Sequence, residues 1–319
     1  MMVMASANTV LAHAPAAPEP SRPARAAPLL VPALLACYLV WGSTYLAIRF
    51  ALESFPPFFQ MGTRFLAAGI LLMAWVVLRK HSLPTLREWR NAAVVGALML
   101  GGGMGLVASA EVHIGSGLIA TFIAVVPMMV SAWGLFFGQR PGRLEWLGMA
   151  LGLSGVLLLV RGASFSAAPA GLACIAGATT LWSLGSVLST TRLPLARGAA
   201  GFASEMLCGG AVLMVVSLAL GEEQAVAAFW PATSIAAVAW LYLVVFGSLI
   251  AFSAYLYLLA HAPPAVATSY AFVNPLIAIF LGAFFAQERV TGGEWLACVV
   301  ILTGVFLIFR GKSATSGCK

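Results

Sequence analysis

Arg64 and Glu205 carry charge in places where the sequence is otherwise strongly apolar. Arg64 lies in "MGTRFLAAGI" and Glu205 lies in "GFASEMLCGG". A charge in apolar surroundings is costly unless it is paired or reached by water. The chemistry that we expect of these two residues is therefore ion pairing or the carrying of a proton.

Two polar clusters follow from the other charged residues that lie near the same depth. The first would join Arg64 to Glu111 or Glu53. The second would join Glu205 to one of three basic residues: Arg192, Arg197 and His261. These clusters could act as gates that open in turn, or they could be static packing pairs. Glu111 or Glu205 could also carry a coupling proton if it is buried.

Aromatic and amide side chains near the middle of the apolar segments are candidates for contact with a ligand. Trp41 and Tyr45 are four residues apart and would share one helix face. Trp182 holds the position equivalent to Trp41 in the second half of the chain, and Tyr270 and Asn274 are again four residues apart. These residues could line a cavity, or they could fill helix interfaces.

Pro127 and Pro275 interrupt apolar runs, and we expect each of them to kink a helix and free backbone carbonyls. No catalytic cluster is predicted, because the chain has no Asp and its Glu residues are scattered. The five Cys residues have no metal-like spacing, so we expect no metal site and no cofactor.

Composition identifies the elements that must position these groups. Apolar residues make up 61% of the chain and charged residues only 8%, whereas about a quarter of a soluble protein is charged. A membrane-spanning helix needs about 20 apolar residues. Ten such windows can be read in the sequence: 29–50, 57–78, 91–111, 116–137, 143–161, 170–191, 199–220, 234–260, 263–285 and 292–310. The prediction is an all-α membrane protein with ten transmembrane helices, preceded by a disordered tail over residues 1–28.

The distribution of basic residues predicts the orientation. If the N-terminus is cytoplasmic, 13 of the 17 Lys and Arg residues fall on the cytoplasmic side. Because cytoplasmic loops carry an excess of Lys and Arg, we expect both termini in the cytoplasm, including a short tail over residues 311–319.

The chain also has an internal duplication. A shift of 141 positions places Trp41 on Trp182 and Arg64 on Glu205, and a shift of 148 places Pro127 on Pro275. The repeats are residues 29–161 and 170–310. Because each would contain five spans, the second enters the membrane from the opposite side. Such inverted repeats are typical of secondary transporters, which bind substrate near the midplane.

Several motifs together resemble a known family. They are "WGSTYLAIR", "TRFLAAG", "SGLIATFIAVVP", "GSLIAFSAYLYLL", "ATSYAFVNPLIAIFLG" and "ILTGVFLI". They are similar to the EamA-type permeases of the drug/metabolite transporter superfamily, in the ten-helix exporter subgroup. The resemblance implies a plasma-membrane exporter of small metabolites, such as amino-acid-like compounds, or drugs. "FGQRPGR" departs from that family, because it lacks the acidic residue that often follows the fourth span.

The expected function is alternating-access export, coupled to protons, by a protein that is not an enzyme. Its partners would be a small-molecule substrate, protons and the lipid bilayer, and not nucleic acid. The alternatives are a non-transporting membrane subunit and a membrane-embedded enzyme. The latter would need a polar catalytic cluster at one membrane face.

Overall fold

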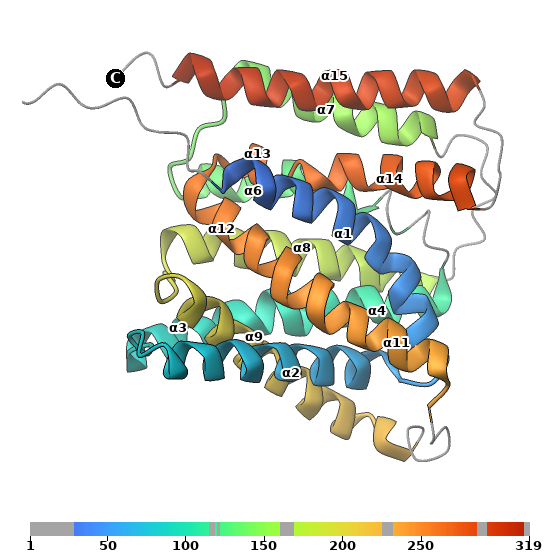
Figure 1. Cartoon of the computed structure of the whole chain (residues 1–319). Helices are drawn as coiled ribbons and strands as arrows, with labels where there is room; N and C mark the ends of the chain where they lie inside the picture. Colours follow the sequence, from blue (N-terminus) through green and yellow to red (C-terminus); the bar gives the residue numbers. More distant parts are fainter. Residues whose placement is uncertain are drawn as a thin grey trace, which may run out of the picture.

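The computed structural model describes residues 29–114, 119, 122–159, 169–224, 232–285 and 292–315. All regular elements in these ranges are helices, and Figure 1 shows them lying largely side by side. The predicted tail over residues 1–28 lies outside the described residues, as do residues 316–319 of the second tail. The all-helical fold predicted from the composition is confirmed for this part of the chain.

Within the described ranges, six helices are long and apolar enough to cross a membrane. They are α1 (Leu30–Ala51), α2 (Pro57–Leu78), Leu86–His113, α8 (Pro169–Thr191), α9 (Ala199–Ala219) and Ser234–His261. The other predicted windows contain shorter or less apolar helices. These are α6 (Val126–Phe136), α7 (Arg143–Leu159), α13 (Pro264–Ala267), α14 (Tyr270–Phe285) and α15 (Gly292–Thr315).

Local sequence signals explain where several helices begin. Pro57 stands in the first turn of α2, where its missing N–H costs nothing. The Glu222 carboxylate accepts hydrogen bonds from the backbone N–H groups of Phe58, at 3.3 Å, and Phe59, at 2.7 Å. Thr85 and Glu88 form a capping box, so the third long helix begins at Leu86 rather than at the predicted residue 91.

Two of the long helices contain a π-helical segment at their centre. Leu86–His113 consists of α3 (Leu86–Gly96), η1 (Ala97–Met104) and α4 (Gly105–His113). Ser234–His261 consists of α11 (Ser234–Tyr242), η2 (Leu243–Phe252) and α12 (Ser253–His261). The two segments fall at equivalent positions of the sequence duplication. Such segments leave backbone groups without their usual helical partners and are frequent at functional sites.

The predicted proline kinks differ from the structure. Pro275 lies inside α14, but the chain breaks earlier, at Thr268 and Ser269, between α13 and α14. Pro127 lies in the first turn of α6, after a turn at Ala124 and Val125, so it begins a helix instead of bending one. A proline is tolerated in a first turn, which explains the second difference.

Close glycine contacts hold two helix pairs together. A Cβ atom on Gly304 of α15 would lie 2.6 Å from the carbonyl oxygen of Gly148 in α7. A Cβ on Gly210 of α9 would lie 2.9 Å from the backbone nitrogen of Leu66 in α2. Small residues allow helix backbones to approach in this way. Figure 1 shows α7 and α15 side by side at one edge of the bundle.

Candidate functional site

A central cavity lies between α1 and α8, and η1, α4, α6 and α14 complete its wall. Its volume is about 50 Å³. This is far below the roughly 300–1,000 Å³ of pockets that hold a metabolite-sized ligand. Its lining is mostly apolar and aromatic, and includes Trp41, Thr44, Tyr45, Gly103, Thr179, Trp182 and Tyr270. A metabolite can enter only if the surrounding helices separate.

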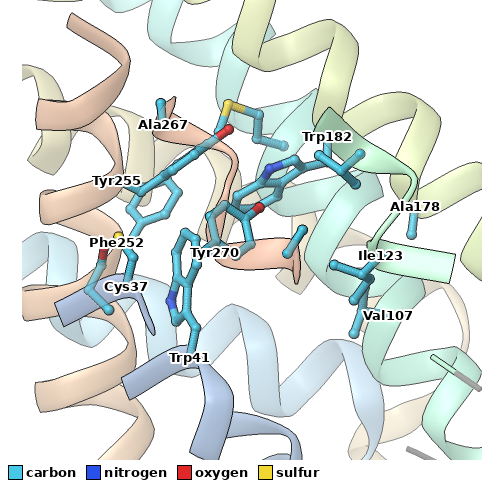
Figure 2. Packing of buried hydrophobic residues seen from close by; sticks show 14 of the residues in the cluster. Cys37, Trp41, Val107, Ile123, Ala178, Trp182, Phe252, Tyr255, Ala267 and Tyr270 are labelled. Carbon is cyan, nitrogen blue, oxygen red and sulfur yellow. Dashed lines mark hydrogen bonds between the residues drawn. The ribbon is translucent and has the colours of Figure 1, made fainter. Parts of the chain in front are cut away.

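Four aromatic rings from both halves of the chain meet beside this cavity. The ring centroid of Trp41 lies 4.7 Å from that of Tyr270 and 5.7 Å from that of Trp182. Tyr255 stacks on Trp182 at 5.3 Å. Figure 2 shows Trp41, Trp182, Tyr255 and Tyr270 converging on one another. The structure therefore brings together Trp41, Trp182 and Tyr270, which sequence patterns had singled out.

Tyr255 was missed by the sequence analysis. It is fully buried, and its hydroxyl lies 2.9 Å from the Ser186 hydroxyl. Tyr255 lies two residues before another tyrosine, Tyr257, in "AYLYLL", and Val107 occupies the equivalent position of the first repeat. Neither the duplication nor helical spacing distinguishes it from an ordinary packing residue.

Asn274 and Tyr45 form a polar contact at the edge of the cavity. Their side chains lie close to each other. The Asn274 amide is oriented with its nitrogen toward two backbone carbonyls. The nitrogen donates to the Tyr38 carbonyl oxygen at 3.2 Å and to the Tyr270 carbonyl oxygen at 3.1 Å. Asn274 therefore contacts Tyr45 and Tyr270, which line the cavity, but is not itself among the lining residues.

The indole N–H groups of the two central tryptophans have different partners. Trp41 donates to the carbonyl oxygen of Gly247 in η2, at 3.3 Å. The Trp182 N–H lies near the hydroxyls of Tyr255 and Tyr270 but makes no well-formed hydrogen bond with a described residue. A buried donor without a partner is unusual in a folded protein. Trp182 therefore presents an unused donor beside the cavity.

Arg64 is almost completely buried, at 1% exposure, and the predicted pairing with Glu111 or Glu53 is wrong for this conformation. Its Nε donates to the Ser248 hydroxyl in η2 at 2.7 Å. Its guanidinium also lies 4.8 Å from the Phe65 ring centroid. The physical reason is that Gly247 has no side chain, which leaves room for the guanidinium against the backbone of η2.

Glu205 is fully buried, and neither of its carboxylate oxygens has a hydrogen-bond partner among the described residues. Its pairing with Arg192, Arg197 or His261 is therefore also wrong for this conformation. Cys208 and Tyr255 are close enough to interact with it electrostatically. Glu205 lies on α9, which packs against η1, as Arg64 lies on α2, which packs against η2.

The two other predicted gate residues lie apart from these. Glu111, at the end of α4, interacts electrostatically with Arg49 at the end of α1. His261 is exposed at the end of α12, where its ring stacks on Tyr257 at 4.2 Å and its Nδ1 lies 2.9 Å from the Tyr257 carbonyl. Within the described ranges, no three His, Cys or Glu side chains converge as a metal ion would require.

Comparison with known proteins places this geometry in context. A family model described as the EamA-like transporter family matches residues 29–161 and, separately, residues 169–310. "Uncharacterized inner membrane transporter YedA" of Escherichia coli (strain K12) is 43% identical over 281 residues, which cover 88% of this chain and 90% of that protein.

More distant matches also cover most of the chain. "Uncharacterized transporter sll0355" of Synechocystis sp. is 26% identical, over 86% of this chain and 88% of that protein. A solved crystal structure with 20% sequence identity superposes with a TM-score of 0.69, over 87% of this chain and 95% of that one. At this identity the structural likeness shows the fold alone.

Proposed function

Because this chain belongs to the EamA-like transporter family, we propose that it is a secondary transporter that exports small metabolites, such as amino-acid-like compounds, or drugs. Since the described part of the chain contains six helices long and apolar enough to span a bilayer, it is a multi-pass membrane protein. The membrane in which it acts is the bacterial inner membrane, as the name of its 43% identical relative suggests.

The proposed architecture is two inverted five-helix repeats, residues 29–161 and 170–310, with ten spans and both termini in the cytoplasm. The two separate matches of the family model support this division. Equivalent contacts support it as well, because α1 packs on η2 and α14 while α8 packs on η1 and α6. Inverted repeats of this kind place their binding site at the interface between them.

The proposed substrate site is the central cavity, and the aromatic cluster is the observation that carries this assignment. Trp41 and Trp182 come from equivalent helices of the two repeats and meet beside the cavity. Tyr45, Tyr270 and Asn274 would orient a bound compound. Because the cavity, at about 50 Å³, is far smaller than the roughly 300–1,000 Å³ of a ligand pocket, transport would require the repeats to separate on alternate sides.

Glu205 is the residue that we propose for proton coupling. Its buried carboxyl group has no hydrogen-bond partner among the described residues, so the neutral form avoids the cost of a buried charge. Glu111 and Arg49 would form a gate at the opposite end of the bundle, together with Arg64 deeper in the same half. The second gate would be formed around Glu205. His261, exposed at the end of α12, would reach it only after a movement of that helix.

A counterflow screen in proteoliposomes tests the proposed function. Vesicles containing the purified protein are loaded with one unlabelled compound, and entry of the same labelled compound is measured for amino acids, purines and cationic drugs. The proposal predicts transient accumulation for at least one class. Protein-free vesicles are the control, and the absence of accumulation in every class would reject transport of these compounds.

A further inference from the structure

We infer that the transported compound carries a carboxylate group, which Arg64 attracts and the Trp182 indole N–H binds. The inference rests on the proposed function, because it assumes that the compound enters the central cavity. The two groups that would recognise the carboxylate are the Arg64 guanidinium, which has no anionic partner among the described residues, and the Trp182 indole N–H, which has no hydrogen-bond acceptor among them.

Arg64 has a full positive charge and no anionic partner among the described residues. Its polar contacts are the Ser248 hydroxyl, at 2.7 Å, and the Met61 sulfur, at 3.5 Å. Both of these partners are neutral. A buried arginine is normally stabilised by a carboxylate or phosphate that its planar donor groups can bind in pairs. An anionic ligand would supply the charge that the protein does not.

The Arg64 guanidinium lies directly behind the wall of the central cavity. A Cβ atom built on Gly247 would lie 2.9 Å from Arg64 Nη2 and 3.3 Å from Thr44 Cγ2. Thr44 lines the cavity, and Arg64 therefore lies one residue layer from it. Since α1 carries Thr44 and η2 carries Gly247, separation of these two elements exposes the guanidinium to the cavity.

The Trp182 indole supplies the second half of the recognition site. Its ring lines the cavity, and its buried N–H lies near the hydroxyls of Tyr255 and Tyr270 but has no hydrogen-bond partner among the described residues, so a ligand would reach it only when these rings move apart. Trp41 connects the two groups, because its ring packs on Trp182 and its own N–H binds Gly247. A ligand oxygen that accepts from Trp182 would satisfy this donor while Arg64 balances its charge.

The lining favours a carboxylate over other charged groups. A single guanidinium balances one negative charge, so a phosphate dianion would remain partly uncompensated. The cavity walls are otherwise apolar and aromatic, which suits a compact hydrophobic body attached to the anionic group. A compound with only a cationic group would face the Arg64 charge, and Glu111, the acidic residue near Tyr45 of the lining, already interacts with Arg49.

Binding of three matched probes tests the inference. Phenylacetate, phenylacetamide and phenethylammonium have the same ring and similar size but are anionic, neutral and cationic. Their binding to the purified full-length protein is measured by equilibrium dialysis with radiolabelled compounds. We expect phenylacetate to bind at least about tenfold more tightly than the amide, which corresponds to ~1.4 kcal/mol.

Variants assign this preference to the two residues. Arg64→Gln and Trp182→Phe should each weaken phenylacetate binding while leaving the amide nearly unchanged, and Arg64→Lys should keep the preference for the acid. Arg87→Gln, which removes an exposed arginine, should change neither. If Arg64→Gln does not fold, Arg64→Lys and the comparison of probes on the wild-type protein still decide the result.

Equal binding of the acid and the amide by the wild-type protein would overturn the inference, as would an acid preference that survives both Arg64→Gln and Trp182→Phe. Failure of all three probes to bind would also overturn it. These failures are distinguishable from failure of the proposed function, because counterflow of a compound without a carboxylate would preserve transport and reject only the substrate class.

Discussion

At the scale of single residues, the central tryptophans differ from the other aromatics by where they lie. Trp41 and Trp182 are 8% and 7% exposed and meet beside the cavity, whereas Trp75 is 43% exposed on the outside of α2. Aromatic rings beside the cavity can stack on a ligand, whereas rings on the outside of the helix bundle contact lipid. The sequence alone left these two roles open.

Trp41→Ala and Trp182→Ala should change substrate preference. We expect the ratio of counterflow rates between an aromatic and an aliphatic substrate to fall about tenfold, equivalent to ~1.4 kcal/mol, because stacking in the cavity is lost. Rates are normalised to the amount of folded protein. Trp75→Ala is the matched control, and an equal change in that variant would contradict a cavity role.

Glu205→Gln should separate transport from the proton gradient. The amide keeps the shape of the carboxyl group but cannot release a proton, and the groups near Glu205 are Cys208 and Tyr255. Counterflow should continue in this variant, while concentrative transport driven by an imposed pH gradient should be lost. Glu53→Gln, at an exposed site, should retain both activities. Gradient-driven transport in Glu205→Gln would rule out this residue as the coupling site.

At the scale of elements, apolar windows located helices well but said little about their internal geometry. The window at 57–78 coincides with α2, and the window at 29–50 differs from α1 by one residue at each end. The π-helical segments η1 and η2 could not be predicted. A π-helix has a wider turn than an α-helix, but in a segment that is almost uniformly apolar this change leaves no trace in the sequence pattern.

The contacts of the buried charged side chains could not be predicted from the sequence either. The duplication aligns Arg64 with Glu205, and the sequence analysis then sought for each residue an opposite charge at the same depth. Arg64 instead binds the neutral Ser248, and it can do so because Gly247 leaves space beside η2. Such a contact depends on backbone geometry, which residue spacing does not encode.

The contact between α7 and α15 should be sensitive to a single methyl group. In Gly304→Ala the new Cβ would lie 2.6 Å from both the Gly148 oxygen and the Gly152 nitrogen, which are backbone atoms and cannot move freely. We expect a loss of about 1–3 kcal/mol of stability, seen as a lower melting temperature of the purified protein. Gly142→Ala has no heavy atom within 4 Å of its new Cβ and should melt as the wild type does. Equal melting of both variants would disprove close packing at Gly304.

At the scale of the whole molecule, the proposed topology places both chain ends on the same side of the membrane. A fluorescent protein that matures only in the cytoplasm, fused to either terminus, should fluoresce in both cases. The physical reason is the excess of Lys and Arg in the segments assigned to that side. A fusion within residues 221–233, between α9 and α11, should remain dark. A dark terminal fusion that is expressed and inserted would reject this orientation.

If substrate passes through the cavity between α1 and α8, a bulky group attached inside that cavity should block transport. Thr179 lines the cavity, whereas Ala176 lies on an exposed part of the same helix. Cysteine is introduced at each position, and counterflow is measured before and after treatment with a bulky maleimide, with wild-type protein treated alongside. We predict that modification abolishes flux only in Thr179→Cys and that bound substrate slows the modification. Undiminished flux through fully modified Thr179→Cys would contradict the account.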